Sequence, residues 1–188
     1  MTRNTRALQA AATSRMPLVV GVFQNENCEN ISQIVQEVGL DLVQLHGDEG
    51  MEACNPAKCG GVPAIRVVHM PPDKGDAFNR ARAIVDSFTS SYPQAILLDT
   101  SVKGAQGGTG VTFDWNVAQE LQTTFGLPVL VAGGLTAENI QDIVTNTKPW
   151  GVDVSSGVES MPGQKDRAKV EAFVAGARHS AAEASKGF

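Results

Sequence analysis

The sequence predicts an α/β fold built on a parallel sheet, because short apolar runs alternate with segments of helical periodicity. The apolar runs are rich in Val, Ile and Leu, as strands covered by helices on both faces are. These strand-like runs are residues 18–23, 42–45, 62–68, 95–99, 128–134 and 151–157. They predict six βα units in one domain, since no linker, low-complexity tract or change of composition divides the 188 residues.

Helical periodicity fills most of the sequence between these runs. The predicted helices are residues 29–39, 73–90, 113–126, 136–144 and 165–180. The apolar stripe of the first helix consists of Ile31, Ile34, Val35 and Val38. Gly39 is expected to end that helix. Asp114 and Thr136 are candidate N-caps of two later helices, because their side chains can accept hydrogen bonds from the first N–H groups.

The composition argues against several classes of protein. The net charge of −5 disfavours nucleic acid as a partner, because phosphate backbones require a basic surface. No apolar run approaches the roughly 18 residues of a membrane span, so no membrane partner is expected. His46, His69 and His179 lack the spacing of metal ligands, and no metal site is expected. The three cysteines, Cys28, Cys54 and Cys59, form no CxxC and no even-numbered framework, so a reducing cytoplasm is expected.

The N-terminal segment, residues 1–17, has two interpretations. Its first 15 residues carry three Arg and no acidic residue, which is typical of a mitochondrial presequence. Residues 6–15 are also built from good helix formers, which favours the remnant of a helix that leads into the first strand. The domain proper is expected to span residues 18–188.

Two architectures fit the alternation of strands and helices: an open doubly wound sheet and a (β/α)8 barrel. The dinucleotide fingerprint GxGxxG does not follow the first run, which disfavours the doubly wound sheet. Polar residues follow the strands at their carboxyl ends, where a barrel carries its functional groups. They are Gln24, Asn25, His46, Gly47, Asp99, Thr100, Gly133, Gly134 and Ser155–Gly157. The pattern therefore favours a (β/α)8 barrel, of which about six βα units are counted in this chain.

Two of these strand ends predict a phosphate site. The segments "AGGLTAEN" (132–139) and "DVSSGVE" (153–159) each place glycine between a strand and a helical start. Phosphate is bound by close backbone N–H groups, by hydroxyls and by the positive end of a helix dipole. Barrels commonly build such a site from their last two loops. The alternative is that both clusters are ordinary turns that start helices.

A third strand end, "ILLDT", places Asp99 directly after three aliphatic residues and before a glycine-rich loop, residues 104–110. The carboxyl is expected to be partly shielded from water by these aliphatic neighbours, which would raise its pKa. The alternative is that Asp99 only terminates the strand and that the glycines only fill a loop.

The chain also resembles a known family, the phosphoribosylanthranilate isomerases of tryptophan biosynthesis. The resemblance runs from about residue 18 to residue 178 and rests on "VGVF.N", "VQLHGDE", "LLDT....GGTG..FDW", "AGGLT.EN" and "VDVSSGVE..PG.KD". It implies a TIM barrel whose third to eighth strands are present, and an Amadori rearrangement of N-(5-phosphoribosyl)anthranilate that needs no cofactor. It implies that Asp99 is the general acid and that Gly133, Gly134, Ser156 and Gly157 bind the substrate phosphate. It further implies substrate-loop roles for His46, Gly107, Gly108 and Asp153. For His46 two roles remain open, orienting the substrate or only supporting the loop.

The sequence departs from the family where the first two βα units would stand. The family's general base is the cysteine of a "KxCG" motif, and this chain has no such motif. Cys28 lies on the correct face but fits a helix start better, whereas Cys54 and Cys59 fall in a helix and in a loop of the opposite face. Three readings remain open: a fragment of a longer chain, a chain complemented by a separate tryptophan-pathway segment, or a degenerate copy.

Other functions fit the sequence less well than the isomerase. A metal-dependent epimerase would need ligands at several strand ends, and indole-glycerol-phosphate synthase would need Lys and Glu pairs there; neither pattern occurs. The alternative that the missing base favours is a catalytically incomplete, phosphate-binding part of a longer tryptophan-pathway protein.

Overall fold

The computed structural model describes residues 17–71, 75–88, 93–100 and 114–185. The chain forms two compact units. The first unit comprises Met1–Val68 and Ile84–Ile96, and the second comprises His69–Ala83 and Leu97–Phe188. The expectations for residues 1–16, a helix remnant or a presequence, lie outside the described residues.

Six strands form the main sheet, and their order in the sheet is their order in the chain. They are β1 (Val20–Phe23), β2 (Leu42–Leu45), β3 (Ala64–Met70), β4 (Ala95–Thr100), β5 (Val129–Val131) and β6 (Gly151–Val152). Each lies within or beside a predicted apolar run, so the strand prediction is confirmed. The helices are α2 (Cys28–Val38), α3 (Ala77–Asp86), α4 (Asn116–Thr123), α5 (Ile140–Thr147) and α6 (Arg167–Ser185). There are also two short 3₁₀ turns. The turn η1 (Met51–Cys54) lies between β2 and β3, and the turn η2 (Ser156–Val158) directly precedes a short hairpin. None of the described helices is long and apolar enough to cross a membrane.

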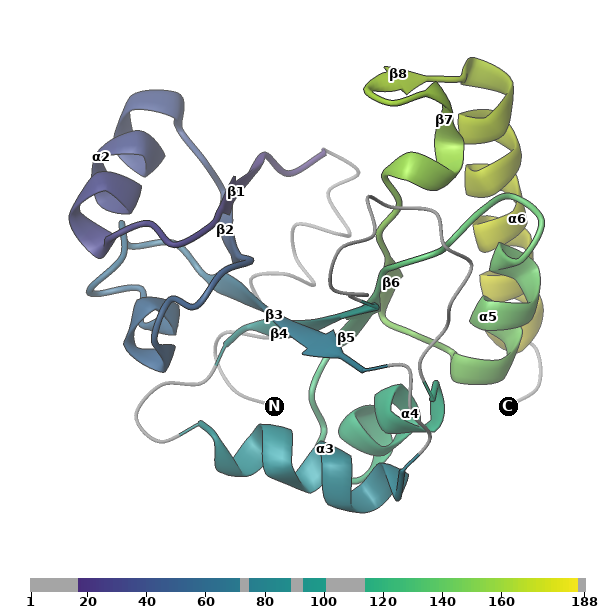
Figure 1. Ribbon diagram of the computed structural model, residues 1–188, viewed down its shortest axis with the longest axis horizontal. Helices are drawn as coiled ribbons and strands as arrows, with labels where there is room; N and C mark the ends of the chain where they lie inside the picture. The colour runs from purple at the N-terminus through teal and green to yellow at the C-terminus, as the bar shows by residue number, and fades with distance from the viewer. Residues whose placement is uncertain (1–16, 72–74, 89–92, 101–113, 186–188) are drawn as a thin grey trace. The chain divides into compact units, whose positions relative to one another are not determined.

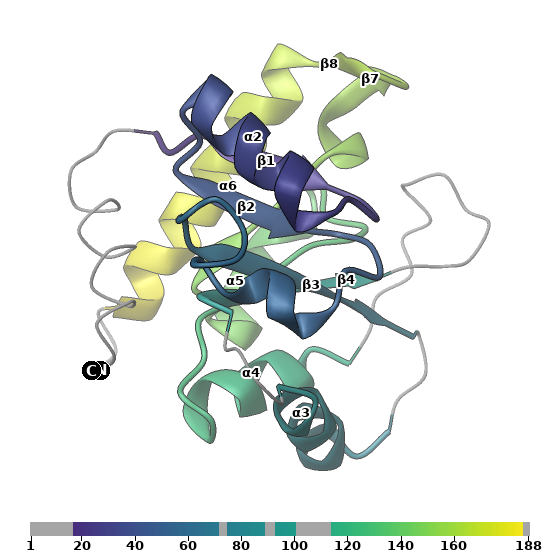
Figure 2. The same cartoon turned by 90° about the vertical axis from the view of Figure 1, so that its left-hand side faces the viewer.

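In the first unit, β1, β2 and β3 are parallel neighbours, with Val20 opposite Leu42 and Val43 opposite Ala64. Helix α2 lies beside β1 and β2 in both views (Figures 1 and 2). It begins after Asn27, whose side chain accepts from the backbone N–H of Asn30. It ends at Gly39, which adopts the left-handed conformation with φ 74°, as predicted for a C-terminal glycine.

The predicted apolar stripe of α2 is only half correct. Ile31 and Val35 are buried in a cluster with Val43 and Leu45. Ile34 and Val38, however, are 37% and 61% exposed. Periodicity places side chains on one face of a helix, but it does not say how far the opposing layer extends.

In the second unit, the backbone N–H of Ala132 donates to the carbonyl of Leu98 at 2.8 Å, which joins the end of β4 to β5. Strand β5 pairs in parallel with β6, with Leu130 opposite Gly151. Helices α5 and α6 lie side by side (Figure 1), and Gly176 of α6 leaves no room for a side chain against Ile140 of α5. Buried residues of β5 and α5, together with Leu97 and Leu98 of β4, form the core of this unit.

Two helix starts differ from the sequence prediction. Helix α4 begins at Asn116 rather than next to Asp114, although the Asp114 carboxylate accepts from the Asn116 N–H at 3.1 Å. Helix α5 begins at Ile140, because the segment from Thr136 first makes a turn in which the Thr136 hydroxyl accepts from the Glu138 N–H at 3.3 Å. The capping interactions were therefore predicted, but they belong to the turns that precede the helices.

A small antiparallel hairpin was not predicted at all. Its strands are β7 (Glu159–Met161) and β8 (Gln164–Lys165), and Gly163 turns between them with φ 81°. Apart from Glu159, the residues of these strands are exposed, and the strands are too short to give a recognisable alternation of apolar and polar residues. Figure 1 shows the hairpin next to the start of α6, which it leads into.

Candidate active site

Asp99 lies near the carboxyl end of β4, behind four residues that are completely or almost completely buried. Its side chain is 20% exposed, so the carboxyl is partly shielded from water. His69, at the end of β3 in the same unit, places its Nδ1 4.0 Å from Asp99 Oδ2. Asp99 therefore lies at the carboxyl-terminal edge of the parallel sheet, where a barrel carries its functional groups.

Gly133 brings the loop after β5 into direct contact with the end of β4. Its φ of 80° is in the left-handed region, as is that of Gly134 at 64°. A Cβ atom on Gly133 would lie 2.7 Å from Asp99 Oδ1 and would overlap the Thr100 side chain. Only glycine fits both the conformation and the space, so the glycine loop passes beside the Asp99 carboxylate.

Asn139 closes this first glycine loop. Its side-chain amide donates to the Gly134 carbonyl at 2.9 Å, and its Oδ1 accepts from the Thr136 N–H at 2.8 Å. The sequence reasoning did not single out Asn139, although an Asn directly before an apolar helical run is a recognisable cap signal. Its role is to fix the loop geometry from inside the turn.

The second glycine loop follows β6 and touches the first. Asp153 extends the sheet, since its N–H donates to the Val131 carbonyl at 2.9 Å. Ser156 and Gly157 form the start of η2. A Cβ atom on Gly157 would overlap the Leu135 carbonyl oxygen. The two loops predicted to bind phosphate are therefore packed backbone against backbone, and the first of them lies beside Asp99.

His46 belongs to the first unit, directly after β2. Its backbone N–H donates to the Phe23 carbonyl at 2.8 Å and continues the pairing of β1 with β2. The next residue, Gly47, has no room for a side chain because a Cβ atom would lie 2.5 Å from the Asn25 N–H nitrogen. His46 thus stands at the base of a closely packed loop.

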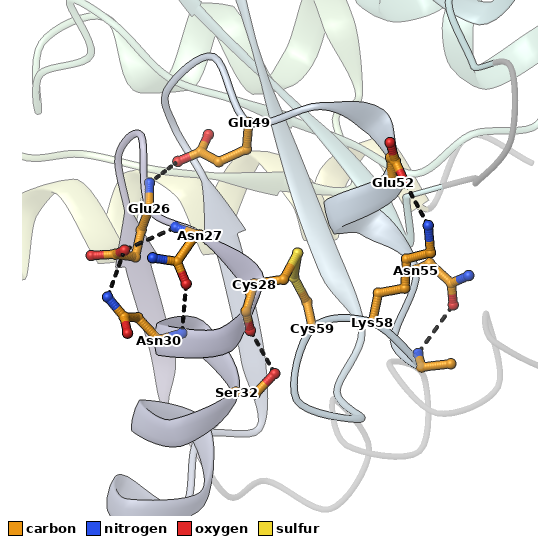
Figure 3. The surroundings of a disulfide bond; sticks show 11 residues. Glu26, Asn27, Cys28, Asn30, Ser32, Glu49, Glu52, Asn55, Lys58 and Cys59 are labelled. Carbon is orange, nitrogen blue, oxygen red and sulfur yellow. Dashed lines mark hydrogen bonds and ion pairs between the residues drawn. A yellow bond between two sulfur atoms is a disulfide. The ribbon is translucent and has the colours of Figure 1, made fainter.

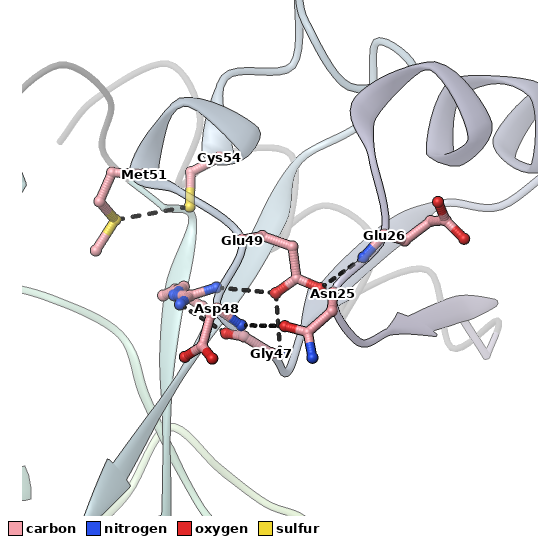
Figure 4. A network of polar contacts seen from close by, with 8 residues as sticks. Asn25, Glu26, Gly47, Asp48, Glu49, Met51 and Cys54 are labelled. Atoms are coloured by element: carbon pink, nitrogen blue, oxygen red, sulfur yellow. Dashed lines mark hydrogen bonds and ion pairs between the residues drawn. The ribbon is translucent and has the colours of Figure 1, made fainter.

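A buried ion pair holds the His46 loop in place (Figure 4). Glu49, with a side chain only 2% exposed, accepts from Arg66 Nη1 at 3.2 Å and from the Gly47 N–H at 2.9 Å. Arg66 Nη2 also donates to the Gly47 carbonyl at 2.8 Å. Asn25 Oδ1 accepts from the Asp48 N–H at 2.7 Å and ties the loop to the end of β1. These contacts support a fixed orientation for this loop.

The odd number of cysteines and their spacing predicted no disulfide framework, and that prediction is wrong. Cys28 at the start of α2 and Cys59 before β3 form a disulfide bond, with a Cα–Cα distance of 4.8 Å (Figure 3). The bond joins positions 31 residues apart in sequence, at the start of α2 and in a turn that packs on the same apolar cluster, and no spacing rule detects such a pair. In the disulfide, the Cys28 sulfur cannot become a thiolate, so Cys28 cannot serve as a general base in this state.

The third cysteine, Cys54, is a buried free thiol whose Sγ lies 4.0 Å from Met51 Sδ (Figure 4). Burial raises the pKa of this thiol to about 11, with Arg66 acting in the opposite direction. Beside the disulfide lies a cavity of about 410 Å³. Glu26, Cys28, Glu52 and Lys58 are among the residues that line it.

The predicted flap residues Gly107 and Gly108 lie outside the described residues. The other predicted site residues are all described. Asp99, Gly133, Gly134, Asp153, Ser156 and Gly157 belong to the second unit, whereas His46 belongs to the first.

Comparisons with known proteins identify the family. The sequence model of N-(5'phosphoribosyl)anthranilate (PRA) isomerase matches residues 2–176. The chain is 49% identical over 174 residues to "Tryptophan biosynthesis protein TRP1" of Phytophthora nicotianae; the match covers 92% of this chain and 32% of that protein. The chain thus spans about a third of the length of this relative. It is 43% identical over 171 residues to N-(5'-phosphoribosyl)anthranilate isomerase of Pseudomonas aeruginosa, covering 90% of this chain and 72% of that one.

A solved structure agrees with the sequence comparisons. It is phosphoribosyl anthranilate isomerase in complex with reduced 1-(o-carboxyphenylamino)-1-deoxyribulose 5-phosphate. The TM-score is 0.64 at 29% identity, and the match covers 95% of this chain and 80% of that one. The fold of these enzymes is the TIM barrel, so the predicted fold class, an incomplete (β/α)8 barrel, is confirmed. The chain therefore belongs to the N-(5'-phosphoribosyl)anthranilate isomerase family.

Proposed function

We propose that this chain carries the acid and phosphate-binding parts of a phosphoribosylanthranilate isomerase. In this reaction a general acid protonates the furanose ring oxygen, the C1–O bond breaks, and the anthranilate nitrogen holds C1 as a Schiff base. A base then removes the C2 proton, and the resulting enolamine becomes the aminoketose. Asp99 is the acid of this proposal, and Gly133, Gly134, Ser156 and Gly157 hold the phosphate.

The observation that carries the proposal is the placement of Asp99 against Gly133. A phosphorylated sugar needs an acid for its ring oxygen and, a few atoms away, donors for its phosphate. The loop of Gly133 and Gly134 lies beside the carboxylate, and the loop of Ser156 and Gly157 packs onto it. Phosphate bound to these loops would place the ribose over the end of β4, within reach of Asp99.

The phosphate assignment is tested by binding, independently of turnover. Calorimetry with reduced 1-(o-carboxyphenylamino)-1-deoxyribulose 5-phosphate should give a dissociation constant that weakens in Gly134→Glu and Ser156→Glu, because a carboxylate repels the phosphate. Unchanged affinity in both variants would remove the phosphate site from the proposal.

The general base is proposed to come from a fused or complementing tryptophan-pathway segment. This chain has no "KxCG" motif, and its Cys28 is bonded to Cys59. The relative from Phytophthora nicotianae, of which this chain matches 32%, supports the fused arrangement. In this proposal, residues 18–188 form the barrel domain, and residues 1–17 are either a helix or a presequence. The protein would act in the cytoplasm.

An isomerase assay on two proteins tests the proposed roles of Asp99 and of the missing base. One protein is the purified chain alone, and the other is the chain fused at residue 16 to a βα segment that bears "KxCG". We expect turnover in the fusion, and Asp99→Asn should lower it by ~100- to 10,000-fold because the transferable proton is lost. A fusion that turns over without any effect of Asp99→Asn would exclude Asp99 as the acid. A fusion that binds the product analogue without turnover would favour the alternative function, a phosphate-binding part.

A further inference from the structure

Lys165 reaches from the β7–β8 hairpin to the second phosphate loop. Its Nζ donates to the Ser155 carbonyl at 3.0 Å and to the Ser155 hydroxyl at 3.3 Å. It also donates to a carboxylate oxygen of Glu159, whose side chain is only 14% exposed. Ser155 directly precedes Ser156 and Gly157, so Lys165 holds the residue from which the phosphate loop starts.

The contacts of Lys165 distinguish a positioning role from direct phosphate binding. An ammonium group has three N–H donors and no acceptor. All three find acceptors here, in the Ser155 carbonyl, the Ser155 hydroxyl and Glu159. Lys165 would have to break one of these bonds to contact a phosphate.

The loop needs contacts with neighbouring elements, because η2 is only three residues long and too short to be stable by itself. Ser155 has an irregular backbone conformation, with φ −121° and ψ −84°. On the far side, the Asp166 N–H donates to the Val158 carbonyl at 2.8 Å, and Lys169 Nζ donates to the Glu159 carbonyl at 2.7 Å. The start of α6 and the hairpin therefore clamp both ends of the segment 155–158.

We propose that Lys165 is a positioning residue for substrate phosphate, acting through Ser155 to fix the loop of Ser156 and Gly157. The inference rests on the proposed function, since it assigns a further residue to the same phosphate site. It predicts that the geometry of the loop, rather than the charge of Lys165, sets phosphate affinity.

The experiment compares the wild-type chain with Lys165→Met and with Arg167→Met as the matched control. Arg167 is two residues away and also cationic, but it pairs with Glu171 on the surface of α6. Binding of reduced 1-(o-carboxyphenylamino)-1-deoxyribulose 5-phosphate is measured by calorimetry at low and high salt. We expect about tenfold weaker binding in Lys165→Met at both salt concentrations, and little change in Arg167→Met. A loss that fades at high salt would assign Lys165 to direct charge attraction and overturn the proposal.

A second measurement needs no ligand. Hydrogen exchange of the Val158 and Asp166 amides, whose acceptors lie within the clamped segment, should be about tenfold faster in Lys165→Met. Amides of α5 should exchange at the wild-type rate, which shows that the variant is folded. Unchanged exchange rates at Val158 and Asp166 would overturn the proposed role of Lys165, whether or not the analogue binds more weakly. If the wild type does not bind the analogue while the clamp is confirmed, it is the phosphate site of the proposed function that fails.

Discussion

The two units of the chain hold their loops by different means. In the first unit, a disulfide joins Cys28 to Cys59 and a buried ion pair joins Glu49 to Arg66. In the second unit, the candidate phosphate loops are held by close backbone contacts at Gly133 and Gly157 and by the side chains of Asn139 and Lys165. A close glycine contact also occurs in the first unit, where Gly47 has no room for a side chain against Asn25, but there the disulfide and the ion pair add to it. The units should therefore respond to different perturbations.

The largest effect is expected at Gly133. Gly133→Ala combines a left-handed φ with overlap against Thr100 and Asp99. Backbone strain and overpacking together should lower the free energy of unfolding by about 4 kcal/mol. Urea unfolding of Gly133→Ala and Gly61→Ala measures this difference. Gly61 also has a left-handed φ, 81°, but nothing lies within 4 Å of its added Cβ.

The control at Gly61 isolates the steric part of the effect, since both variants share the backbone strain. Gly61→Ala should cost about 1 kcal/mol. Equal losses in the two variants would mean that the second unit has room at Gly133 and that its loops are not held by close approach.

Reduction of the disulfide is expected to act next most strongly. The Cys28–Cys59 bond closes a segment of 31 residues, and loop-closure entropy gives it a contribution of about 3–4 kcal/mol. A phosphine reductant should therefore lower the midpoint of thermal unfolding in the wild type. The double variant Cys28→Ser, Cys59→Ser should unfold at the lower midpoint with or without reductant. A wild type that does not respond to reduction would show that the first unit relies on its packing and ion pair alone.

Features that depend on local sequence patterns could be predicted, whereas contacts between distant parts of the chain could not. The strands, Gly39 as a helix end and Asp99 at a strand end follow from local patterns of polarity and from turn residues. Asn139 carried a recognisable cap signal, because it directly precedes an apolar helical run, although it was not singled out. The contact of Lys165 could not be predicted, because it binds the backbone carbonyl of Ser155, which carries no sequence signal. The pairing of Cys28 with Cys59 and the exposure of Val38 depend on which elements pack together, and that information is not local. Sequence thus located the candidate site but not the contacts that hold its loops.

Thiol reactivity should separate the cysteines once the disulfide is reduced. Burial raises the pKa of Cys54 to about 11, so at pH 7.5 only roughly 0.03% of it is thiolate, the reactive form. Cys28 is only partly buried and lines the cavity of about 410 Å³, so a reagent can approach it more easily than Cys54. Iodoacetamide followed by peptide mass spectrometry should label Cys28 first. The Cys54 rate should rise about tenfold per pH unit toward pH 11, because each unit raises the thiolate fraction tenfold. Equal labelling of Cys54 and Cys28 at pH 7.5 would contradict the burial of Cys54.

The smallest expected effect concerns the clamp of the second unit at low pH. The hydrogen bond from Lys165 holds the pKa of Glu159 below its ordinary value of 4.5. A carboxyl whose pKa is lowered by folding stabilises the folded state above the ordinary pKa, and this contribution is lost as pH falls through the lowered pKa. The clamp should therefore be intact at pH 6 and weaken only below pH 4.5.

NMR shifts of the Ser155–Val158 amides, followed from pH 6 to pH 3, should report a midpoint below pH 4.5 in the wild type. In Lys165→Met the midpoint should move up toward the ordinary value, because the donor to the carboxylate is gone. A midpoint that is the same in both proteins would mean that Glu159 does not depend on Lys165, and the clamp would lose one of its three acceptors.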